Sequence, residues 1–176
     1  REKTRIPMVF LTYANPIFTY GRDKFFQQCR DVEIDGVIVP DVPFEEKATI
    51  APEAEKYGVE IISMIAPTSH QRIQSIAREA QGYIYLVSSL GVTGVRKEIT
   101  TNLKEIVEKI REVSDKPIAV GFGISTPEQA KEMAEISDGA IVGSAIVKLC
   151  AQYGKDCVEP VKQYVKEMAE AVDEAK

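Results

Sequence analysis

The sequence lacks the features that mark several large classes of protein. It has no apolar run near the roughly 18 residues that a membrane-spanning helix requires. Its three cysteines, Cys29, Cys150 and Cys157, are odd in number and show no CxxC spacing, which predicts neither a disulfide framework nor a zinc site. Lys and Arg number 22 against 27 Asp and Glu, and the net charge of −5 argues against a nucleic acid partner. We therefore expect a protein of the reducing cytoplasm that binds neither membrane nor nucleic acid.

Signatures of nucleotide binding and of acid–base catalysis are also missing. No GxxxxGK[ST] and no GxGxxG segment is present, so a nucleotide-binding loop is not predicted. The one histidine, His70, has no identifiable catalytic partner. Asp35 and Asp138 each precede a glycine that leads into a predicted strand, so we expect both at the end of the fold that serves stability. On these grounds the chain is better equipped to bind a ligand than to react with it.

The sequence does contain an alternation of short β-branched runs with amphipathic segments, the pattern of parallel βαβ units. Six strands are predicted, at residues 7–12, 36–39, 60–66, 83–87, 118–121 and 140–143. Helices are predicted at 23–32, 45–57, 102–113, 127–136 and 159–175. Thr126 places a capping hydroxyl before Pro127, a typical helix start. With 176 residues and no linker, the chain is expected to form a single domain over residues 1–176.

Glycine-rich turns at three successive strand ends point to an anion site. Six parallel units fit either a doubly wound sheet or part of an eight-stranded barrel, and the period alone does not separate them. One glycine turn can simply end a strand, but barrels commonly bind phosphate at their last strand ends. Glycine lets backbone N–H groups approach the anion, and an opening helix adds its positive end. Ser144 adds a hydroxyl at such a helix start, and Thr93, in another of these turns, could close the other side of the expected anion site.

Aromatic residues and one carboxylate are further candidates at the strand ends. Tyr83 and Tyr85 are two positions apart and so share one face of their strand. If that face is the barrel interior, Tyr85 lies nearer the mouth, where its phenol could meet a substrate. Phe122 either flanks a planar ligand or plugs the mouth. Asp41 follows a buried strand in a loop stiffened by two prolines. Its role could be that of an acid, an interface group or a helix cap.

Five segments carry a family resemblance through their combination, order and spacing. They are Thr12-Tyr13-Ala14-Asn15-Pro16, Val39-Pro40-Asp41-Val42-Pro43, the stretch from Tyr85-Leu86-Val87-Ser88 through Gly91-Val92-Thr93-Gly94, Gly121-Phe122-Gly123-Ile124-Ser125, and Val142-Gly143-Ser144-Ala145-Ile146-Val147. Over essentially the whole chain they resemble the alpha subunit of tryptophan synthase. The resemblance implies the α/β fold of a (β/α)8 TIM barrel, with about six βα units, strands three to eight, in this chain. Another phosphate-binding barrel would share the glycine turns but not the Tyr-Ala-Asn-Pro and Pro-Asp-Val-Pro segments.

The resemblance implies a lyase of tryptophan biosynthesis that cleaves indole-3-glycerol phosphate to indole and glyceraldehyde 3-phosphate by a retro-aldol step. It implies no metal or organic cofactor in this subunit, and as partner a beta subunit that holds pyridoxal phosphate, in a complex of two alpha and two beta subunits. The positions that resemble the phosphate-binding residues are Gly94, Gly121, Gly123, Gly143 and Ser144. Those that resemble substrate-binding residues are Tyr85, Thr93 and Phe122. The loops that face the beta subunit contain Tyr13, Asn15, Asp41 and Pro43.

The catalytic carboxylates of this family, a glutamate and an aspartate, lie on the first two barrel strands. By the resemblance this chain, whose first residue is Arg1, begins just before the third strand. We therefore expect both carboxylates in a missing N-terminal part, and no catalytic residue in this chain. Six of eight strands would also leave two unpaired edges and an open core. A lyase completed by its N-terminal part is the leading interpretation, and the alternative is an inactive fragment that binds a phosphate ligand or a beta subunit.

Overall fold

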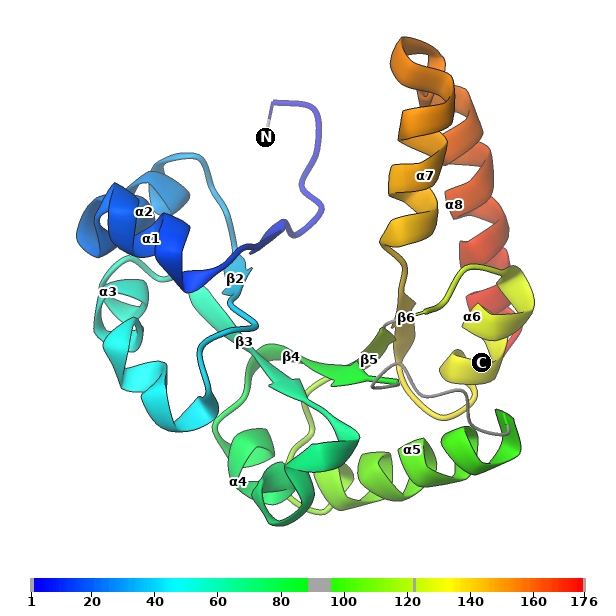
Figure 1. The fold of residues 1–176 in the computed structure, drawn as a ribbon, viewed down its shortest axis with the longest axis horizontal. Coiled ribbons are helices and arrows are strands. Elements are labelled where there is room, and N and C mark those ends of the chain that lie inside the picture. The colour runs from blue at the N-terminus through cyan, green and yellow to red at the C-terminus, as the bar shows by residue number, and fades with distance from the viewer. Residues whose placement is uncertain (1, 89–95, 122, 176) are drawn as a thin grey trace.

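The computed structural model describes residues 2–88, 96–121 and 123–175, and this part of the chain is built on one parallel sheet (Figure 1). Its strands are β1 (Val9–Leu11), β2 (Gly36–Ile38), β3 (Glu60–Ile65), β4 (Gln81–Val87), β5 (Ile118–Gly121) and β6 (Gly139–Ile141). They pair in chain order from β1 to β6, and every pair is parallel. A doubly wound sheet reverses its strand order at a switch point, whereas a barrel does not. The structure therefore confirms the barrel type, present as a curled six-stranded arc.

Helices connect the strands and lie along the outer side of the arc (Figure 1). Those that follow β1 to β3 are α1 (Ala14–Tyr20), α2 (Arg22–Asp31), η1 (Phe44–Thr49), α3 (Ala51–Lys56), η2 (Pro67–Arg72) and α4 (Ile73–Arg78). Those that follow β4 to β6 are α5 (Arg96–Arg111), α6 (Pro127–Ala134), α7 (Ser144–Tyr153), η3 (Gly154–Asp156) and α8 (Val158–Asp173). Each helix predicted from the sequence is present, although 45–57 is divided into η1 and α3. In the described ranges, no helix is long and apolar enough to cross a membrane.

The apolar side chains divide between the two faces of the sheet. On β3, Ile61 and Ile65 pack outward in the two large clusters under the helices, while Ile62 and Met64 belong to a small inner cluster. The inner cluster also contains Tyr83 and Tyr85, so the predicted shared face of these tyrosines is the interior of the arc. The helices thus bury the outer face thoroughly, and the inner face remains available for a ligand.

Exposed apolar side chains mark the two ends of the arc. Among the described strands, β1 and β6 each pair with a single neighbour. Leu11 on β1 is 59% exposed, and Val147 on α7, beyond β6, is 67% exposed. Open sheet edges of this kind invite pairing with further backbone. The expectation of two unpaired edges therefore holds for the described part of the chain.

Two aspartates hold the amino ends of neighbouring strands together. The Asp35 carboxylate accepts a hydrogen bond of 2.7 Å from the backbone N–H of Met8, and the Asp138 carboxylate accepts one of 2.7 Å from Ile118. In both pairs the aspartate N–H donates to the carbonyl of the same residue, at 2.9 Å. Asp35 and Asp138 precede β2 and β6, and their partners lie at the start of the adjacent strands β1 and β5. Their predicted place at the amino ends of the strands is confirmed.

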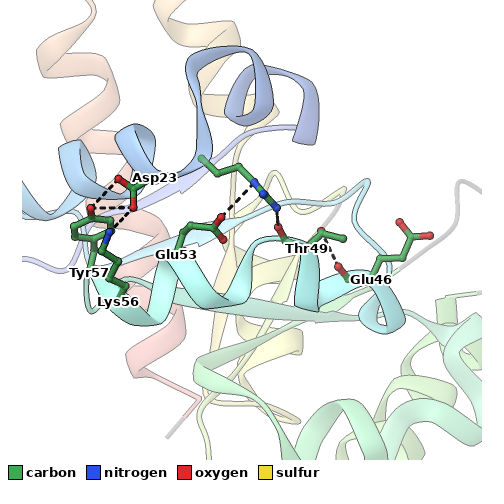
Figure 2. Close-up of polar contacts among 7 residues, drawn as sticks. Asp23, Glu46, Thr49, Glu53, Lys56 and Tyr57 are labelled. Carbon is green, nitrogen blue, oxygen red and sulfur yellow. Dashed lines mark hydrogen bonds and ion pairs between the residues drawn. The ribbon is translucent and has the colours of Figure 1, made fainter.

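Polar contacts fasten α2 to the segment that follows β2 (Figure 2). The Asp23 carboxylate accepts hydrogen bonds from Lys56 Nζ at 2.6 Å and from the Tyr57 hydroxyl at 3.0 Å. These two donors lower the pKa of Asp23. Arg22 donates to the Thr49 carbonyl and pairs with Glu53 at 3.3 Å. Because α2 and α3 are joined in this way, the loops at the carboxyl ends of β1 and β2 are held in a fixed relation.

We expect Asp35→Ala and Asp138→Ala each to lower the free energy of unfolding by about 1 kcal/mol or more, because each leaves a strand-start N–H without its charged acceptor. Asp31→Ala is the matched control. It removes an exposed ion pair with Arg30 and should change the same quantity by less than about 0.5 kcal/mol. Urea denaturation followed by circular dichroism measures all three. Equal losses for the control and for the two strand-start variants would contradict this role.

Candidate functional site

The carboxyl ends of β4, β5 and β6 lie side by side, because the three strands are parallel and adjacent. This arrangement brings together most of the residues predicted to bind substrate or phosphate, namely Tyr85, Gly121, Gly123, Gly143 and Ser144. Thr93, Gly94 and Phe122 lie outside the described residues. The described part of the predicted site therefore lies along the carboxyl ends of the strands.

The N-terminus of α7 is built to attract an anion. Gly143 is its N-cap, and no side chain hydrogen-bonds to the cap. The first turn contains no acidic residue, and the first N–H groups of any helix lack an acceptor within the helix. A Cβ added to Gly143 would meet nothing within 4 Å, so the space beside it is open. The helix start thus combines partial positive charge, N–H groups without an acceptor inside the helix and the Ser144 hydroxyl, next to open space at Gly143.

Tyr85 lies across Gly121, the last residue of β5. A Cβ added to Gly121 would stand 2.6 Å from Cζ of Tyr85 and 2.8 Å from Cε1, closer than real Cβ atoms approach. A side chain at position 121 would therefore force the tyrosine ring to shift, which is a second reason for glycine there besides the anion approach expected from the sequence. Tyr85 is 9% exposed, and burial raises the pKa of its phenol. At neutral pH the phenol is protonated and can donate a hydrogen bond.

The loop after β5 is anchored by α6 and α8. Gly123 has φ +78°, a left-handed conformation that favours glycine. The Thr126 hydroxyl caps α6 by accepting from the Gln129 N–H at 3.3 Å, which confirms the predicted helix start. The Gln129 side chain accepts in return from the Ser125 N–H at 2.8 Å. The Tyr164 hydroxyl on α8 donates to the Ser125 carbonyl at 2.8 Å, a contact that the sequence did not indicate.

Asp41 connects the two loops predicted to face a partner. Both of its carboxylate oxygens accept from the backbone N–H of Ala14, at 2.9 and 3.2 Å. Ala14 is the first residue of α1, so of the three roles considered for Asp41 the structure shows a helix cap supplied from a neighbouring loop. Ala14 stands between Tyr13 and Asn15, which are exposed, as are Asp41 and Pro43. The four predicted interface residues are thus exposed on two loops that this bond joins at the carboxyl ends of β1 and β2.

A cleft of about 470 Å³ opens at the carboxyl ends of β2 and β3, between η1 and η2. Its lining is mainly apolar, and its two cations are already bonded within the protein. Arg72 pairs with Glu45 at 3.0 Å, and Lys47 donates to the Glu79 carbonyl at 3.3 Å. The cleft therefore suits an apolar group better than it suits a phosphate.

Groups for proton transfer are scarce at this edge. Among the described residues that directly follow β1, β2, β3, β5 and β6, Asp41 is the residue with a carboxylate. Both of its oxygens accept hydrogen bonds from the Ala14 N–H. The described residues also contain no group of three or more His, Cys, Asp and Glu that could hold a metal ion. The described residues thus present an uncapped helix start that suits an anion and a separate, mainly apolar cleft at the ends of β2 and β3, and those that directly follow the strands supply no acid–base pair.

The contact between Tyr85 and Gly121 makes a prediction about stability. We expect Gly121→Ala to cost roughly 1 to 3 kcal/mol of unfolding free energy, because the new methyl group overlaps the ring. In the Tyr85→Ala background the same change should cost much less, since the ring is gone. Gly139→Ala on β6 is the control, because a Cβ there meets nothing within 4 Å. Equal costs of Gly121→Ala in the two backgrounds, measured by urea denaturation, would show that the overlap does not matter.

Comparison with known sequences identifies the family of this chain. The family model described as tryptophan synthase alpha chain matches residues 1–175. The tryptophan synthase alpha chain of Lacticaseibacillus casei is 47% identical over 176 residues, which are 100% of this chain and 66% of that one. The same protein of Lactiplantibacillus plantarum is 48% identical over 174 residues, or 98% of this chain and 66% of that one. This chain thus spans 66% of the length of these curated relatives.

Solved structures of tryptophan synthase alpha subunits share the fold of this chain. The tryptophan synthase alpha subunit of Campylobacter jejuni matches with a TM-score of 0.85 and 34% identity, over 94% of this chain and 66% of that one. The alpha chain from Legionella pneumophila matches with a TM-score of 0.80 and 34% identity, over 95% of this chain and 63% of that one. The six-stranded arc is therefore the counterpart of a large part of a TIM barrel.

Proposed function

Since this chain belongs to the tryptophan synthase alpha chain family, we propose that it forms the phosphate-binding part of a lyase that acts on indole-3-glycerol phosphate. The reaction is a retro-aldol cleavage to indole and glyceraldehyde 3-phosphate. The observation that carries the proposal is the uncapped start of α7 at Gly143, open to solvent and on the same edge as Tyr85. An anion site and a protonated phenol at the carboxyl ends of β4 to β6, with an apolar cleft at the carboxyl ends of β2 and β3, match the three chemical parts of this substrate.

Each candidate residue has a role in this proposal. The first N–H groups of α7 and the Ser144 hydroxyl bind the phosphate, with backbone N–H groups of Gly94, Gly121, Gly123 and Gly143 around it. Tyr85 donates a hydrogen bond toward the substrate. By the family resemblance, Thr93 would contact the phosphate side and Phe122 the indole ring. This subunit uses no metal or organic cofactor.

The chemical step needs groups that the described residues do not provide. A base removes the proton of the glycerol hydroxyl next to the ring, a carbonyl forms, the carbon–carbon bond breaks, and an acid protonates the indole carbon. We propose that a glutamate and an aspartate outside these 176 residues perform the two proton transfers, as the family resemblance implies. The engagement of Asp41 by Ala14 supports this division of labour. An inactive binding fragment is the second candidate, favoured by the same observation.

The proposed partner is a tryptophan synthase beta subunit containing pyridoxal phosphate, in a cytoplasmic complex of two alpha and two beta subunits. Its docking surface would be formed by Tyr13, Asn15, Asp41 and Pro43. Support comes from their exposure and from the bond between Asp41 and Ala14, which holds the two loops as one unit. The apolar cleft borders this surface at Asp41 and Pro43, so an apolar product would leave the site along it.

Asp41→Ala tests the partner proposal. We expect roughly tenfold weaker binding to a beta subunit, because the charged hydrogen bonds that position Tyr13 and Asn15 are lost. Titration calorimetry with the beta subunit gives the dissociation constant. Asp31→Ala, on the outer helix α2, should leave this constant unchanged. A dissociation constant for Asp41→Ala equal to that of the unsubstituted chain would remove the surface from consideration.

Gly143→Asp tests the phosphate site. The added carboxylate would occupy the space in which the phosphate binds and would repel it, so we expect at least about a hundredfold loss of affinity for indole-3-glycerol phosphate. The matched control is Gly139→Asp, with the same charge change at the opposite end of β6, where a Cβ also meets nothing within 4 Å. Calorimetry on both variants decides the question, and unchanged affinity in Gly143→Asp would refute the phosphate assignment.

Indole release from the same samples separates the two candidate functions. A protein with an intact mass near 19.5 kDa that binds the ligand and releases no indole supports the binding fragment. A longer chain that carries further residues before Arg1 and releases indole supports the lyase.

A further inference from the structure

Two cysteines lie close together at the turn between α7 and α8, away from the glycine turns. Figure 1 shows these helices side by side, with α7 leaving the sheet and α8 returning toward it. Cys150 is in the last turn of α7, and Cys157 is the N-cap of α8. The Gly154 N–H donates to the Cys150 carbonyl, and the Cys157 N–H donates to the Gly154 carbonyl at 3.3 Å. Backbone hydrogen bonds therefore hold the two residues on either side of one compact turn.

Both thiols lie at this turn. Loss of hydration and, to a smaller extent, the neighbouring Cys157 thiol raise the pKa of the Cys150 thiol. Cys150 is exposed and Cys157 is half-buried, so reagents can reach the pair. Cys29 is 1% exposed on α2, and burial raises the pKa of its thiol. It serves as an internal unreactive thiol for comparison.

We propose that Cys150 and Cys157 form a reversible disulfide that ties the end of α7 to the start of α8, with a peroxide as the oxidant. One thiolate attacks a peroxide oxygen, so that an S–O bond forms, the O–O bond breaks and hydroxide leaves. The second thiol attacks the resulting sulfenic sulfur, so that the S–S bond forms, the S–O bond breaks and water leaves. Two thiols thereby lose two electrons and two protons, and hydrogen peroxide becomes two waters. A dithiol reductant reverses the reaction by exchange.

This site is independent of the proposed phosphate site, although both lie on α7. Gly143 and Ser144 are at the start of the helix, and Cys150 is in its last turn. A disulfide here closes a short loop around Gly154, which has a positive φ of 53° and reverses the chain. The covalent loop prevents the last turn of α7 from unwinding away from α8. In a reducing compartment both thiols stay free, so the link would form only during oxidation.

Peptide mapping tests the proposal on the native chain. Trypsin cleaves after Lys148, Lys155 and Lys162, so each of the two cysteines falls in a separate peptide, 149–155 and 156–162. The chain is treated with hydrogen peroxide and then unfolded in denaturant so that every remaining free thiol, including that of Cys29, is alkylated, and digestion proceeds without reductant. We expect the intact chain to lose two hydrogens, the two peptides to remain joined, and Cys29 to be alkylated. Dithiothreitol should restore the original mass and separate the peptides.

Three variants identify the sulfur atoms. Cys150→Ser and Cys157→Ser should each abolish both the mass loss and the joined peptides, while Cys29→Ser should retain them. Serine is tolerated at the two turn positions because neither cysteine belongs to the buried apolar core. A mass loss that persists in Cys150→Ser would overturn the proposal. So would joined peptides from two different chains, or oxygen addition to separate cysteines with no joined peptide.

Discussion

The parallel direction of the strands is the constraint on which the rest of this structure depends. Each strand must be followed by a connection that returns to the same end of the sheet, and these connections form the outer layer of helices. All carboxyl ends then lie on one edge, which is why Tyr85, Gly121, Gly143 and Asp41 share it although they are distant in sequence. At the opposite, amino ends of the strands, the carboxylates of Asp35 and Asp138 instead accept hydrogen bonds from strand-start N–H groups.

The sequence predicted what local patterns encode. Short apolar runs rich in β-branched residues located the strands, Thr126 before Pro127 located a helix start, and the spacing of Tyr83 and Tyr85 placed both on one face. Helix α1 was not predicted, because a proline and several β-branched or aromatic residues favour a loop by propensity. That helix is started instead by Asp41, 27 residues away. The overlap of Tyr85 with Gly121 likewise depends on the pairing of β4 with β5, which no single segment reveals.

One signal in the sequence does reveal a non-local feature. Asp-Gly-Val-Ile-Val at 35–39 and Asp-Gly-Ala-Ile-Val at 138–142 differ at one position, and both aspartates make the same pair of backbone bonds at the same distances. The two segments begin β2 and β6, four strands apart. The Asp-Gly segment therefore starts two different strands of this sheet through the same pair of backbone hydrogen bonds. By contrast, the carboxyl ends of these strands differ completely, since one continues into Asp41 and the other into Gly143.

The close approach of Tyr85 to Gly121 has a consequence for how this family can change over time. A side chain at position 121 would force the ring at position 85 to shift, and a smaller residue at 85 leaves a void beside β5 until 121 is filled. A lineage that exchanges the tyrosine for another group is therefore expected to pass through a less stable intermediate or to change both positions together. Among divergent homologues, the two positions should vary as a pair, so that the residue at one foretells the residue at the other.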